Sequence, residues 1–120
     1  MTEMISQFSD CAGLYSFMSE INTELGKPEA AQEMRNLGNG ATLSALYLLA
    51  TDYATKNKTP KAYGDFQPYV QGRMDAKITS LRAVAERHEM KPLQDDVVAC
   101  NHLQDLQKSI VQRIRDKAYR

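Results

Sequence analysis

The sequence predicts an all-α fold, an antiparallel bundle of about four helices in one helical domain over residues 1–120. Half of the 120 residues are Ala, Leu, Met, Gln, Glu, Lys or Arg, the strongest helix formers. Val and Ile contribute five residues each, and no stretch alternates apolar and polar residues for long enough to suggest a strand. Four prolines divide the chain into segments that are each long enough for one helix.

The first predicted helix runs from about Glu3 to Leu25. Its apolar residues recur at alternating spacings of three and four, which indicates one buried helix face. Gly26 suits the position just after this helix, because a left-handed residue commonly ends a helix there. The expected buried stripe consists of Met4, Phe8, Cys11, Tyr15, Met18 and Leu25, widened by Ile5, Ala12, Leu14 and Ile21.

The second predicted helix begins at Pro28 and reaches about Lys56. Gly38 and Gly40 lie in its middle, and each glycine costs about 1 kcal/mol against alanine inside a helix. A break there would give five shorter helices. We favour a continuous helix, because Gly38, Ala41 and Ala45 share one face and would let a neighbouring helix approach closely.

Two further helices are expected after the loop from Asn57 to Gly64. Asp65 is the predicted N-cap of the third, with Pro68 in its first turn and its end near His88. The fourth should run without interruption from Pro92 to about Lys117. Its expected core stripe is Leu93, Val97, Cys100, Leu103, Ile110, Val111 and Ile114.

The charges are balanced overall but unevenly distributed. A net charge of zero argues against broad attraction to nucleic acid or anionic lipid. The first third of the chain is acidic, whereas the last turn is basic, which suits a helix dipole and an acidic first helix beside a basic last one. The longest apolar run, Ala45 to Ala50, is too short to span a membrane, so a soluble chain is expected. The basic residues near the end are Lys108, Arg113, Arg115, Lys117 and Arg120.

Cys11 and Cys100 both fall on predicted core stripes. A bridge between them would close a loop of nearly ninety residues and imply a periplasmic or exported protein, although the first residues do not resemble a signal peptide. Two buried thiols in a cytoplasmic protein are the other interpretation. In an ideal antiparallel helix pair the two cysteines would be offset by about 10 Å, which counts against a bridge.

No catalytic, cofactor-binding or metal-binding pattern is visible in the sequence. His102 and Cys100 point to nearly opposite sides of a helix, so they do not share a metal, and there is no Glu-x-x-His motif. Gly38-Asn39-Gly40 lacks the preceding strand and the Gly-Lys-Ser/Thr of a phosphate loop. The sequence therefore predicts no cofactor and does not indicate an enzyme.

Four of the nine aromatic residues fall within seventeen positions, next to several lysines. Tyrosines beside cations are typical of protein interfaces, and they also suit stacking on single-stranded nucleic acid. The alternative is that Phe66 and Tyr69 only anchor the loop on the bundle. The candidate partner surface consists of Tyr53, Lys58, Lys61, Tyr63, Phe66 and Tyr69.

Three functions remain open from the sequence. The first is a small helical protein-binding module of the inhibitor, immunity or adaptor type, with an unidentified protein partner. The second is a nucleic-acid-binding accessory protein that uses the basic C-terminal turn and residues 56–61. The third is an enzyme with a pocket between helices near Asp65, Arg73 or His88. The apolar second helix also makes a homo-oligomer a candidate state.

Overall fold

The computed structural model describes residues 2–118 and confirms the all-α helical bundle. Within this range there are five α-helices, one short 3₁₀ helix and no strand. The elements are α1 (Thr2–Glu24), α2 (Pro28–Asn57), η1 (Tyr63–Asp65), α3 (Gln67–Glu86), α4 (Lys91–His102) and α5 (Gln104–Ala118).

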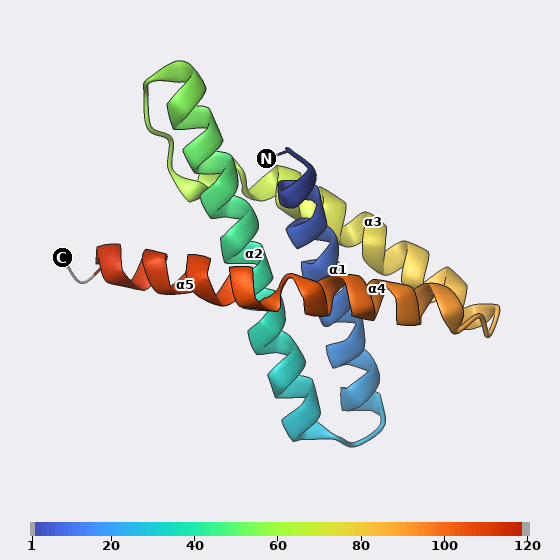
Figure 1. The fold of residues 1–120 in the computed structure, drawn as a ribbon. Coiled ribbons are helices and arrows are strands. Elements are labelled where there is room, and N and C mark those ends of the chain that lie inside the picture. Colours follow the sequence, from blue (N-terminus) through green and yellow to red (C-terminus); the bar gives the residue numbers. More distant parts are fainter. Residues whose placement is uncertain (1, 119–120) are drawn as a thin grey trace.

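Three of the helices form a layer with α1 in the middle. Figure 1 shows α1 and α2 as an antiparallel hairpin, with α3 on the other side of α1. Two ion pairs fix the direction of α3, because Asp10 pairs with Arg73 and Glu20 pairs with Arg82 farther along both helices. Helix α3 therefore runs in the same direction as α1. The acidic residues of α1 thus meet arginines of α3, whereas the sequence led us to expect a basic last helix as their neighbour.

Helices α4 and α5 form an arm that crosses the layer (Figure 1). Along the arm, successive contacts reach α3 at Lys77–Asp96, α1 at Cys11–Cys100 and α2 at Leu37–Gln107. The single last helix expected from Pro92 to Lys117 is wrong, because the helix breaks at Leu103, whose N–H donates to the carbonyl of Cys100. The break lets the arm pass from α1 to α2. The apolar spacing continues through Leu103, so the sequence pattern does not reveal it.

Helix α2 is continuous through Gly38 and Gly40, as predicted, so the fifth helix comes from the break in the arm. Gly38 and Ala41 are buried against α1, and a Cβ atom at position 38 would lie 3.4 Å from the Cβ of Tyr15. At Gly40 a Cβ atom would lie 2.5 Å from the side-chain nitrogen of Gln107 in α5. The two glycines therefore serve two different neighbours, α1 and the arm.

The helix ends match the sequence only in part. Gly26 has φ +70 and ends α1 as expected, with the N–H of Lys27 donating to the carbonyl of Asn22. Leu25, predicted to be buried, is 63% exposed because it follows the last turn. Asp65 is not the N-cap of α3. It belongs to η1, and Phe66 occupies the cap position without a side-chain hydrogen bond.

The core is centred on α1. Phe8, Ala12 and Leu14 are fully buried there, between α2 and α3. Buried hydroxyl groups are satisfied locally, as Ser9 and Ser44 each donate to the carbonyl four residues earlier. Among the described residues, no buried side-chain nitrogen or oxygen lacks a hydrogen-bond partner.

Candidate functional site

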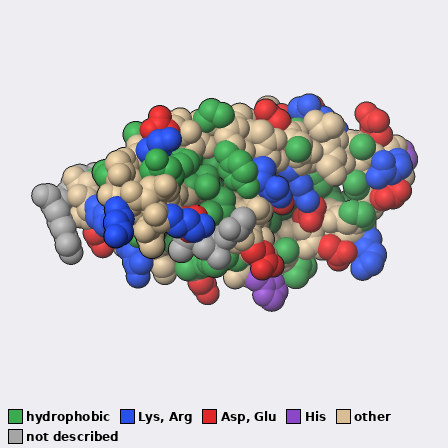
Figure 2. Space-filling model, turned by 90° about the horizontal axis from the view of Figure 1, so that it is seen from above, with side chains coloured by type: hydrophobic (Ala, Val, Ile, Leu, Met, Phe, Trp, Pro, Cys, Tyr) green, Lys and Arg blue, Asp and Glu red, His purple; other side chains and the backbone are tan. Residues whose placement is uncertain are grey.

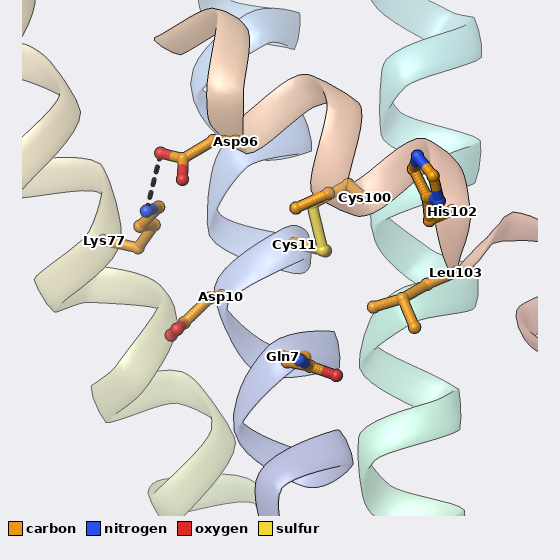
Figure 3. Close-up of a pocket in the computed structure, with 9 residues that line it drawn as sticks. Gln7, Asp10, Cys11, Lys77, Asp96, Cys100, His102 and Leu103 are labelled. Carbon is orange, nitrogen blue, oxygen red and sulfur yellow. Dashed lines mark ion pairs between the residues drawn. A yellow bond between two sulfur atoms is a disulfide. The ribbon is translucent and has the colours of Figure 1, made fainter. Parts of the chain in front are cut away.

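Cys11 and Cys100 are joined by a disulfide in the structure, with their Cα atoms 5.7 Å apart (Figure 3). This distance lies in the usual range for bridged cysteines. The offset of about 10 Å expected for an antiparallel pair does not arise, because α4 crosses α1 and only the crossing point decides the distance. The bridge fastens the arm to the middle of the layer.

A hollow of about 420 Å³ lies beside the disulfide, between α1, α3 and α4. Figure 3 shows Lys77 and Asp96 facing each other at its edge, with their charged atoms 2.7 Å apart. Asp10 also lines the hollow and is paired with Arg73 at 3.0 Å. The hydrogen bond that Arg73 donates to Asp10 is the main reason that the pKa of Arg73 is raised above its usual value. Both carboxylates among the described lining residues are therefore paired with a cation.

The residues suggested for an enzymatic pocket are not brought together. Asp65 precedes α3 and His88 follows it, so the 20 residues of that helix, about 30 Å in length, separate them. Arg73 lies between these two positions and is paired with Asp10. Within residues 2–118, no three His, Cys, Asp or Glu side chains are grouped closely enough to hold a metal ion.

A second hollow, also of about 420 Å³, lies where the ends of α2 and α5 meet the loop before η1. The hollow is shallow, and it is lined by small residues of α2 together with two tyrosines and two lysines. We call it the aromatic–basic hollow and define its walls as Tyr47, Lys61, Tyr63 and Lys117. Figure 2 shows Lys and Arg side chains beside hydrophobic ones at this end of the molecule.

The lysines of this region lie against aromatic rings. The ammonium group of Lys117 is 5.6 Å from the ring centre of Tyr47, and that of Lys61 is 4.9 Å from the ring centre of Tyr53. Both distances are those of cation–π contacts. Burial, with a smaller contribution from Tyr47, raises the pKa of the Tyr63 hydroxyl. The neutral hydroxyl of Tyr63 can donate a hydrogen bond.

The structure gathers most of the partner surface expected from the sequence. Tyr53 and Phe66 meet edge to face with ring centres 5.8 Å apart, and Phe66 anchors the loop on the core. Lys58 is exposed at the end of α2, where it adopts φ 57. Tyr69 does not belong to this surface. It is 46% exposed on α3, where it borders a different hollow together with Arg73.

Sequence reasoning missed Tyr47, whereas it named Lys117 only as part of the basic C-terminal turn. The basic C-terminal turn was visible, but its contact with the loop depends on α5 crossing α2, which no local pattern reveals. Tyr47 looked like one more apolar position in the most apolar stretch of the chain. Arg120, the last basic residue of that turn, lies outside the described residues.

Comparison with known proteins adds no functional assignment. No protein-family model matches the chain, and no curated protein or solved structure gave a significant match. None of the helices in the described range is both long enough and apolar enough to cross a membrane. The function must therefore be argued from the chain's own surface.

Proposed function

We propose that this chain is a small helical protein-binding module, of the inhibitor, immunity or adaptor type, without catalytic activity. The observation that carries the proposal is the aromatic–basic hollow, in which the loop before η1 and the end of α5 contribute to one surface. Two segments that are 50 residues or more apart in the sequence, around Lys61 and Lys117, thus meet at one place. This juxtaposition favours a surface with a binding role. The alternative is that the loop is only anchored on the bundle.

The composition of the hollow suits a protein partner. Tyrosine is enriched at interfaces, because it offers a large apolar ring and a polar end at a small entropic cost. Ala50 and Ala54 form a small-residue floor on which a partner side chain could rest. The hydroxyl of Tyr63 provides a directional hydrogen bond, which apolar contacts alone do not give.

The proposal can be tested by site-specific photo-crosslinking in the native host. A photoreactive phenylalanine analogue placed at position 63 should give a discrete cross-linked protein band. The matched control is the same analogue at Tyr69, which is exposed on α3 outside the hollow. No band at position 63, or the same band at both positions, would contradict the proposal.

A nucleic-acid-binding accessory protein is the second candidate, since one lysine from each of the two basic segments that it needs, residues 56–61 and the C-terminal turn, lines the same hollow: Lys61 and Lys117. Against it, Lys56 is already paired with Asp52 at 3.1 Å. Binding to a single-stranded oligonucleotide should then weaken steeply with salt as phosphate contacts release counterions. No binding at low salt would end this candidate.

Two related proposals concern location and assembly. We infer from the Cys11–Cys100 bridge that the protein works in an oxidising compartment, the periplasm or outside the cell. Rapid alkylation of the native protein should add no label before reduction and two labels after it. Self-association is the other proposal, and a mass in solution that rises with concentration would support it. In the described range, Leu43 is the one large hydrophobic residue of α2 that counts as exposed, at 37%.

A further inference from the structure

We propose that the aromatic–basic hollow recognises an acidic polypeptide segment, with carboxylates placed at Lys61 and Lys117 and a small apolar side chain on the floor between them. This inference rests on the proposed protein-binding function and adds the chemistry of the partner. Three observations carry it: which charges are free, how they are held, and what the hollow can accommodate.

The lysines at the hollow keep an unneutralised positive charge. Among the described residues, neither Lys61 nor Lys117 has a carboxylate within ion-pair distance, whereas Lys56 is paired with Asp52. Lys58 adds a further exposed cation at the same end of α2. A surface with several free ammonium groups over a low-polarity floor attracts carboxylates, and complementary charge also speeds and orients docking.

Cation–π contacts hold these ammonium groups in place while leaving N–H donors free. Lys61 lies over Tyr53 and Lys117 lies over Tyr47, so part of the side-chain entropy is already lost before a partner arrives. The same contacts cover one face of each ring. A base that needed to stack on Tyr47 or Tyr53 would have to compete with a lysine, which favours an acidic peptide over single-stranded nucleic acid.

The hollow is sized for side chains and not for an extended polymer groove. Its volume of about 420 Å³ and its small lining residues, two alanines and two threonines, accommodate one or two residues of a partner segment. Tyr63 lies on the wall and can donate its hydroxyl to a backbone carbonyl or a carboxylate. A segment with two acidic residues flanking a small apolar one would satisfy all of these groups.

The test uses the whole oxidised chain and three probes followed by NMR chemical shifts. The probes are a peptide of about fifteen residues rich in Glu, Ala and Leu, the same peptide with Gln in place of each Glu, and an oligothymidylate of similar length. Shifts confined to the hollow with the Glu peptide alone, at up to about 1 mM, are expected. No shift with that peptide, an equal shift with the Gln peptide, or tighter binding of the oligonucleotide would overturn the proposal.

Charge reversal then locates the contact. Lys61→Glu and Lys117→Glu should each weaken binding of the Glu peptide by up to about fivefold, as expected for one lost exposed ion pair. Lys27→Glu is the matched control, because Lys27 is exposed and its substitution makes the same charge change at the opposite end of α2. Equal effects at all three positions would overturn the proposal. If the cross-link at position 63 still forms in both charge-reversal variants, the acidic partner is ruled out, but the proposed protein-binding function is not.

Discussion

In the layer of α1, α2 and α3, the helices meet through glycines, alanines and fully buried side chains along most of their length. The α4–α5 arm meets the same layer at separate points, which include an ion pair, a disulfide and a buried glutamine. The layer is therefore held by packing that is spread over many residues, whereas the arm combines these specific contacts with a smaller apolar contact through residues such as Leu103 and Ile110. Substitutions in the layer and in the arm can test this difference.

The largest effect is expected in the layer. Phe8→Ala removes a fully buried aromatic side chain from the centre of the core and should lower the free energy of unfolding by about 3–5 kcal/mol. Chemical denaturation measures the loss. Val98→Ala on the arm, where the side chain is 54% exposed, should change stability by less than about 0.5 kcal/mol. A similar loss for both variants would contradict the comparison.

The arm should respond most to loss of its covalent contact. The double variant with Cys11→Ala and Cys100→Ala opens a loop with a sequence separation of 89, which costs about 4.6 kcal/mol in the chain-entropy model. Hydrogen exchange should show that amides of α4 and α5 lose protection before those of α1. Uniform loss of protection across all helices would mean that the arm is as firmly packed as the layer.

Two glycine substitutions should change the free energy of unfolding by amounts that differ in sign or size. Gly72→Ala lies in α3 with open space around it, so the alanine should stabilise the helix by up to about 1 kcal/mol. Gly40→Ala gains the same helix propensity, but its Cβ atom displaces Gln107, which then loses its hydrogen bond to the carbonyl of Leu37. Thermal unfolding should place the two variants about 1–2 kcal/mol apart, and equal stabilities would show that Gln107 contributes nothing to docking of the arm.

The smallest effect concerns the connection between the layer and the arm. His88 follows α3 with φ 57, and its neighbour Glu89 donates its N–H to the carbonyl of Val84, so His88 occupies the position that glycine prefers. His88→Gly should therefore stabilise the protein by about 0.5–1 kcal/mol. Arg87→Gly, at φ −82, should destabilise it instead. Melting temperatures that move in the same direction for both would contradict this account.

Local rules predicted the layer well. The bounds of α1 and α2 agree with the sequence to within one residue, because proline, glycine and the apolar spacing act over a few positions. The continuity of α2 followed from the shared face of Gly38 and Ala41. The predicted burial of Leu25 and the predicted N-cap at Asp65 were wrong for the same kind of reason. Both residues lie at helix ends, where one turn decides burial and capping.

The arm could not be predicted in the same way. The break at Leu103 keeps the apolar spacing intact, and the direction in which the arm crosses the layer depends on contacts with three helices at once. The disulfide and the hollow both follow from that crossing. The sequence therefore offered the two basic segments, around Lys61 and Lys117, but neither Tyr47 nor the crossing that brings these segments to one hollow.

The bridge between Cys11 and Cys100 turns the middle of the chain into a covalent ring that includes α2, the loop and α3. The exposed stretch after α2, with Lys58 and Lys61, is the part of this ring that a trypsin-like protease can reach most readily. A cut there opens the ring, but the two fragments stay one molecule until the sulfur–sulfur bond is reduced. A nicked form would thus keep both sides of the hollow tethered, and proteolytic damage would remain hidden on a non-reducing gel.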